Sequence, residues 1–169
     1  SALISNIRDN LNILGGSLDP HACALLHRGL KTLSLRMNAH NEGALVVANA
    51  LQDHPLVKAV YYPGLEGHAQ HQRAAHYFSG FSGMISFELE GNGTSIDSFL
   101  DALTIPLVAP SLGGVESLVT LPARPSHAGL SPGERREIGI TDTLVRLSVG
   151  IEDPEDIVAD LYRALSLTR

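Results

Sequence analysis

The sequence predicts an α+β fold, in which helices pack on one face of a small, mostly antiparallel sheet. Helical and extended patterns alternate along the chain, and several of the extended patterns are short. A chain of 169 residues, of which 44% are hydrophobic, is long enough for one domain with its own core. We find no internal repeat and no low-complexity segment that would interrupt this domain.

Helices are predicted from capping residues and from apolar residues at three- and four-residue steps. Three helix starts combine a capping side chain with a proline at the first helical position. The capping group is a carboxylate in Asp19-Pro20 and Asp153-Pro154, and a hydroxyl in Ser131-Pro132. Gly29 can take the left-handed conformation that often ends a helix. The predicted helices start after Ser1 and then cover residues 19–29, 32–53, 69–78, 95–103, 131–138 and 153–167.

Strands are predicted where short runs of β-branched or apolar residues lie between prolines and glycines. Pro63-Gly64 turns the chain after the first such run, and Gly80 and Gly91 bound the second. The predicted strands are Val57–Tyr61, Met84–Leu89, Leu107–Val108, 118–121 and 144–149.

Composition excludes several classes of protein. A formal net charge of −6 argues against a nucleic-acid partner, since such proteins need a basic surface. The single Cys23 excludes an internal disulfide framework and fits a reducing compartment, so we expect a cytoplasmic protein. No apolar run approaches the roughly 18 residues of a membrane span. We therefore expect no membrane partner.

Arg146 is the first candidate binding residue. Alternation along residues 144–149 sends Val145, Leu147 and Val149 to one face of the strand, and Arg146 and Ser148 to the other. A guanidinium held on a rigid strand beside a hydroxyl suits two-point capture of a carboxylate. The alternative is an arginine on a solvated strand face, and this segment by itself leaves both interpretations open.

Several further motifs accompany Arg146 in a fixed order. They are Arg28-Gly-Leu-Lys-Thr-Leu33, Tyr62-Pro-Gly-Leu65, Pro110-Ser-Leu-Gly-Gly-Val-Glu-Ser-Leu118, Pro122 and Ser126-His-Ala-Gly129. In this order the chain resembles the C-terminal part of the pyridoxal-phosphate enzymes of cysteine and methionine metabolism, the cystathionine γ-synthases, cystathionine γ-lyases and methionine γ-lyases. The resemblance runs from about residue 12 to residue 165. It implies the C-terminal domain of a fold-type I enzyme.

The resemblance also implies roles for individual residues. Arg146 matches the arginine that grips the α-carboxylate of the amino-acid substrate, and Ser111 matches the serine beside the cofactor lysine and the substrate. Leu112 would form a wall of the substrate pocket. Thr120 matches another pocket position, and Ser126 stands where the family has a threonine near the substrate side chain. Ser111, before two glycines, could equally be an ordinary turn residue.

The cofactor-holding half of such an enzyme is not expected in this chain. Pyridoxal-phosphate chemistry needs a lysine that forms a Schiff base, and only Lys31 and Lys58 are present, neither in a context that resembles the family's cofactor lysine. There is no glycine-rich phosphate cradle. We therefore expect residues 1–169 to be the small C-terminal domain, without a catalytic residue of its own, separated from a large N-terminal domain that binds most of the cofactor. The abrupt helical start looks like an excised or split piece, and the isolated chain is expected to be inactive.

Pro110 departs from part of the family, in which a glutamate at this position engages the distal amino group of cystathionine. A proline there would leave that ammonium without a counter-charge, which argues against cystathionine γ-lyase activity. His68, His71 and His76 lie close in sequence, but a metal site needs more converging ligands, and we expect no metal.

Three functions remain open from the sequence. The first is part of a carbon–sulfur lyase or γ-replacement enzyme of the cystathionine γ-synthase type, acting on sulfur-containing amino acids and forming a homo-oligomer, a dimer or a tetramer, when complete. The second is a non-catalytic scaffold or oligomerisation module derived from that family. The third is a lyase that acts on a larger S-substituted cysteine.

Overall fold

The structure is a computed structural model that describes residues 1–168 apart from Asn92, with Gly93 described by its backbone only; Arg169 lies outside the described residues. The chain divides into two compact units, Ser1–Leu35 and Arg36–Arg169. We describe each unit by itself. Among the described residues no helix is both long enough and apolar enough to cross a membrane.

The first unit consists of two helices, α1 (Ala2–Leu14) and α2 (Pro20–Leu30), and neither contains a buried residue. The Asp19 carboxylate caps α2 as predicted, because it accepts hydrogen bonds from the backbone N–H groups of His21 (2.8 Å) and Ala22 (3.1 Å). The predicted end at Gly29 is wrong. Gly29 lies inside α2, and Lys31 caps the helix in a right-handed conformation, so no left-handed residue is needed there.

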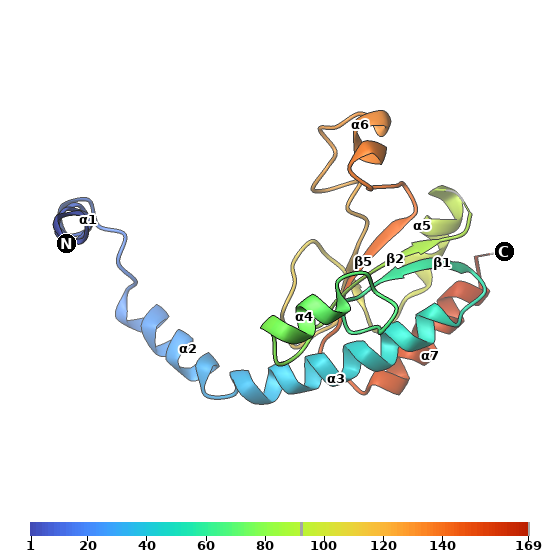
Figure 1. The fold of residues 1–169 in the computed structure, drawn as a ribbon, viewed down its shortest axis with the longest axis horizontal. Coiled ribbons are helices and arrows are strands. Elements are labelled where there is room, and N and C mark those ends of the chain that lie inside the picture. Colours follow the sequence, from blue (N-terminus) through green and yellow to red (C-terminus); the bar gives the residue numbers. More distant parts are fainter. Residues whose placement is uncertain (92, 169) are drawn as a thin grey trace. The chain divides into compact units, whose positions relative to one another are not determined.

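The second unit is built on a five-stranded sheet with the strand order β1-β2-β5-β4-β3, of which the neighbours β1, β2 and β5 are labelled in Figure 1. Every pairing is antiparallel except that of β3 with β4. The predicted small, mostly antiparallel sheet is therefore confirmed. Its strands and the helices of this part of the chain are α3 (Leu33–Gln52), β1 (Val57–Tyr61), α4 (His71–Tyr77), β2 (Met84–Leu89), α5 (Gly93–Ala102), β3 (Leu107–Val108), β4 (Leu118–Thr120), α6 (Pro132–Glu137), β5 (Leu144–Ser148) and α7 (Pro154–Ser166).

One face of the sheet is covered by helices, as the sequence predicts. In Figure 1, α3 and α7 run along the same side of β1, β2 and β5. Three side chains of neighbouring strands, Ile85, Val119 and Leu147, lie in one row on this face and are fully buried. They join a single core to which α3, α5 and α7 contribute the buried residues Ala44, Val47, Ala48, Leu51, Ile96, Phe99, Leu100, Ile157, Leu161, Ala164 and Leu165. Burying each large side chain stabilises the fold by about 2 kcal/mol, so the core fixes the sheet firmly.

The element boundaries follow local signals where these exist. The bounds of β1, β2 and β3 agree with the prediction, and Ser131 and Glu134 form a reciprocal capping box at the start of α6. The prediction started α5 too late, because this helix begins at Gly93.

Candidate functional site

Arg146 lies in the middle of β5, on the face of the sheet opposite the core. Its neighbours in the strand, Val145 and Leu147, are fully buried among the helices, so the backbone at Arg146 is held in place. The register puts Ser86 of β2 on one side of Arg146 and Thr120 of β4 on the other. The guanidinium therefore extends from a rigid position between two hydroxyl-bearing residues.

The guanidinium contacts backbone oxygens rather than a carboxylate. Its Nη2 donates to the carbonyl oxygens of Pro110 (2.7 Å) and Ser111 (3.0 Å). Its Nε is buried and has no hydrogen-bond partner among the described residues. Within this part of the chain no aspartate or glutamate forms an ion pair with Arg146. Among the described residues Arg146 thus keeps a positive charge with no carboxylate beside it and a buried Nε that donates to no protein acceptor.

Ser111 and Leu112 reach this site on the segment that we call the 110–117 loop. Their side chains are exposed, and the loop is held to β5 by the Arg146 contacts and by the backbone N–H of Gly113, which donates to Ser148 Oγ (3.0 Å). Gly113 has φ +76°, a left-handed conformation that favours glycine. The loop therefore presents the Ser111 hydroxyl and the Leu112 side chain to solvent next to Arg146.

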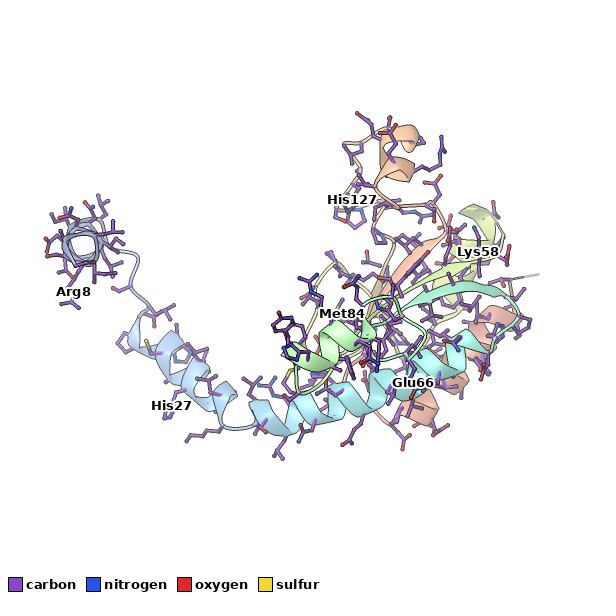
Figure 2. All side chains as sticks on the ribbon, in the orientation of Figure 1. Arg8, His27, Lys58, Glu66, Met84 and His127 are labelled. Carbon is purple, nitrogen blue, oxygen red and sulfur yellow. The ribbon has the colours of Figure 1, made fainter. Side chains whose placement is uncertain are left out.

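The two remaining predicted residues differ in their placement. Thr120 is buried and is the direct partner of Arg146 across the β4–β5 pairing. Ser126 lies in the segment before α6, where its hydroxyl donates to the Pro122 carbonyl (3.0 Å) and lies 2.9 Å from Nδ1 of its neighbour His127, which Figure 2 labels. Among the described residues no hydrogen bond joins Ser126 to Arg146, Ser111 or Thr120. The structure thus brings Thr120 and the backbone of Ser111 to Arg146, Leu112 follows Ser111 in the same loop, and Ser126 forms hydrogen bonds within its own turn.

Two residues of this region carry no predicted role, Ser86 and His40. Ser86 reaches Arg146 only through the β2–β5 register, which no local pattern reveals. His40 of α3 is buried, and its Nδ1 donates to the carbonyl oxygens of Val149 (2.7 Å) and Gly150 (3.1 Å) just after β5. These contacts fasten the end of the strand that carries Arg146. The separation of more than a hundred residues hides this contact from sequence reasoning.

The two lysines do not fit the role of a cofactor lysine. A nucleophilic lysine is activated in a desolvated pocket, whereas Lys31 and Lys58 are both exposed. Lys58 on β1 pairs with the Glu88 carboxylate at 3.6 Å (Figure 2). Neither lysine therefore offers the enclosed amine that a Schiff base with pyridoxal phosphate needs.

The histidines near α4 have local partners. His71 Nδ1 donates to the Pro63 carbonyl (2.8 Å), and His68 Nδ1 accepts from the backbone N–H of Gln70 (3.2 Å). In the part of the chain that the structure describes, no group of three or more histidine, cysteine, aspartate or glutamate residues is arranged to bind a metal.

Known proteins resemble this chain over nearly its whole length. The family model of the Cys/Met metabolism PLP-dependent enzymes matches residues 1–166. Cystathionine gamma-synthase 1, chloroplastic, of Nicotiana tabacum is 48% identical over 163 residues, which are 96% of this chain and 30% of that protein. Cystathionine gamma-lyase of Bacillus subtilis is 47% identical over 154 residues, which are 91% of this chain and 40% of that protein.

Two solved structures share the fold. The cystathionine gamma synthase of Xanthomonas oryzae pv. oryzae, in complex with aminoacrylate and cysteine, has a TM-score of 0.87 at 44% identity and covers 93% of this chain. The cystathione gamma lyase CalE6 of Micromonospora echinospora has a TM-score of 0.91 at 40% identity and covers 98%. The chain spans only 41% and 43% of those two proteins. The chain belongs to the family of pyridoxal-phosphate-dependent enzymes of cysteine and methionine metabolism.

Proposed function

We propose that this chain is the C-terminal, substrate-carboxylate-binding part of a pyridoxal-phosphate-dependent carbon–sulfur lyase or γ-replacement enzyme. Its substrate is a sulfur-containing amino acid. The observation that carries the proposal is the Arg146 guanidinium, which stands on a rigid strand with a buried, unpartnered Nε and no protein carboxylate beside it. A scaffold has no need of such a charge, because burying an unpaired donor costs stability.

The residues of this chain would bind and orient the substrate. The guanidinium of Arg146 would hold the α-carboxylate, Ser111 would place a neutral hydroxyl near the reacting end, and Leu112 and Thr120 would line the pocket. We assign pyridoxal phosphate and its lysine to an N-terminal large domain, because Lys31 and Lys58 do not fit that role. The 169 residues alone are therefore inactive in this proposal.

Pro110 narrows the proposed substrates. Its side chain carries no charge, its carbonyl is held by Arg146, and the residue is exposed at the edge of the site. A second, distal ammonium on a substrate such as cystathionine would find no carboxylate at this position. We therefore propose a substrate without a distal ammonium, which includes larger S-substituted cysteines.

The test is the Arg146→Ala variant of the complete protein, measured by steady-state kinetics. A charge-assisted two-point contact is worth about 2–3 kcal/mol, so kcat/KM should fall about 30- to 150-fold while bound cofactor stays unchanged. Arg146→Lys should recover little, since an ammonium cannot make two parallel contacts. The control is Arg124→Ala, which removes an exposed arginine that pairs with Asp97. A kcat/KM in Arg146→Ala equal to that of the control would overturn the proposal.

The second candidate function is a non-catalytic scaffold or oligomerisation module. The observation in its favour is α1, whose apolar residues recur at three- and four-residue steps and are all exposed: Leu3, Ile4, Ile7, Leu11 and Leu14. Such a stripe packs against a partner surface, either the large domain or another subunit of a dimer or tetramer. If this candidate holds, Ile7→Glu should change the assembly state in light scattering and Arg146→Ala should change nothing.

We propose a cytosolic location. The chain has a single cysteine, Cys23, and so cannot form the internal disulfides that are typical of secreted proteins. Fractionation of cells that express the complete protein would test this location.

A further inference from the structure

The 110–117 loop is held by residues of one short segment, from Arg146 to Glu152. Arg146 and Ser148 hold its first half, at the carbonyl oxygens of Pro110 and Ser111 and at the N–H of Gly113. The turn after β5 holds its second half, since the Ile151 N–H donates to the Val115 carbonyl (2.9 Å) and the Glu152 carboxylate accepts from Ser117. The loop thus has two separate attachments.

The second attachment is dense and belongs to the fold. Ser117 is fully buried; its N–H and its hydroxyl donate to the two Glu152 carboxylate oxygens (2.7 and 2.9 Å), and its Oγ accepts from the Gly150 N–H (2.8 Å). A Cβ at Gly150 would lie 2.3 Å from the Val115 carbonyl oxygen, so the two backbones touch. None of the contacts at this end of the loop involves Ser111.

The first attachment is sparse, and the residues that it holds are exposed. Ser111, Leu112 and Gly113 are all exposed, and among the described residues the hydrogen bonds that hold them to the sheet come from the Arg146 guanidinium and the Ser148 hydroxyl. A ligand carboxylate at Arg146 would compete with the loop carbonyls for the same guanidinium. Ser148, a residue 1% exposed on the same strand face as Arg146, would then still hold the loop through its contact with the Gly113 N–H.

We propose that Ser148 is a positioning residue, which fixes Ser111 beside the substrate by accepting the Gly113 N–H hydrogen bond. This inference rests on the proposed function for the roles of Arg146 and Ser111. Ser148 does not touch the substrate; it acts through the backbone two residues from Ser111. Because Gly113 is exposed, water can replace the lost acceptor, so removing the hydroxyl should loosen the loop without unfolding the domain.

The test compares Ser148→Thr with Ser148→Val in the complete holoenzyme. Threonine and valine have nearly the same shape, and they differ in whether a hydroxyl can accept the hydrogen bond from Gly113. Removing one neutral hydrogen bond should lower kcat about three- to tenfold in Ser148→Val, with KM within twofold, because Arg146 still binds the carboxylate. Ser148→Thr should stay close to the unsubstituted enzyme. Hydrogen–deuterium exchange of a peptide covering residues 110–117 should be faster in Ser148→Val only.

If the added methyl group prevents both variants from folding, Ser148→Ala removes the hydroxyl without overpacking and should show the same lower kcat and the same faster exchange. The proposal is overturned if valine and threonine behave alike, if the loss lies in KM alone, or if loop exchange does not change. The Arg146→Ala variant distinguishes a failure of the proposed function from a failure of the inference about Ser148. Normal activity in that variant defeats the proposed function, whereas an impaired Arg146→Ala together with a normal Ser148→Val defeats only this inference.

Discussion

Asp160 connects α7 by hydrogen bonds to the segment that leads into β3, and replacing it should lower the free energy of unfolding by an amount that its pKa predicts. Asp160 is 5% exposed, and its carboxylate accepts hydrogen bonds from the Thr104 N–H (2.8 Å), the Thr104 hydroxyl (2.6 Å) and the Ile105 N–H (2.9 Å). Arg163, one turn further along α7, donates to it as well. Thr104 and Ile105 lie just before β3 in the chain, and β3 is followed by the 110–117 loop.

The magnitude follows from the pKa of Asp160. Burial by itself raises this pKa, but the hydrogen bonds from Thr104, Ile105 and Arg163 outweigh it and lower the pKa from 3.8 to about 2. A carboxyl whose folded-state pKa is depressed stabilises the fold above its unfolded-state pKa, and this stabilisation is lost as the pH falls through the folded-state value. The ionised group therefore contributes about 2 kcal/mol at neutral pH, which disappears between about pH 4 and pH 2.

The assay is urea unfolding of the 169-residue chain at neutral pH and at steps down to pH 2. Asp160→Asn should lower the free energy of unfolding by about 2 kcal/mol at pH 7, because the amide cannot accept from all four donors. The difference from the unsubstituted chain should shrink toward zero near pH 2. Asp101→Asn, which changes an exposed aspartate at the end of α5, is the control and should have almost no effect. A loss in Asp160→Asn that is independent of pH, or no loss at all, would refute the reasoning.

Two further predictions concern the chemistry of the site. In the complete protein, Pro110→Glu should raise kcat/KM for cystathionine relative to shorter substrates, because it supplies a carboxylate for the distal ammonium; an unchanged preference in competition assays would count against the proposed substrate class. The 169-residue chain, mixed with an equimolar amount of pyridoxal phosphate and then with borohydride, should show no selective, stoichiometric adduct on Lys31 or Lys58, because both are exposed and neither lies in a desolvated pocket that would hold the cofactor. Peptide mass spectrometry checks this, and a stoichiometric adduct on either lysine would disprove the expectation that the cofactor lysine lies outside this chain.

Local signals were enough for most of the secondary structure. A capping side chain acts on backbone groups two or three residues away, so Asp19, Ser131 and Asp153 marked the starts of α2, α6 and α7 correctly. The sequence of β5 also predicted correctly that Val145 and Leu147 are buried and that Arg146 lies on the other face, because successive side chains in a strand point to opposite faces. The end of α2 was placed wrongly, because glycine permits a helix to end and does not require it.

Only the tertiary structure decided what surrounds Arg146. The sheet register brings Ser86 and Thr120 to its two sides, and contacts over more than thirty residues of chain attach the 110–117 loop to Arg146, Ser148 and Glu152. Hydrogen bonds between segments that are distant in the chain leave no periodic trace in the sequence, so neither the register nor these attachments could be read from it. The sequence alone determined that a rigid strand carries an arginine away from the core, and the folded chain determined that its Nε stays unpartnered.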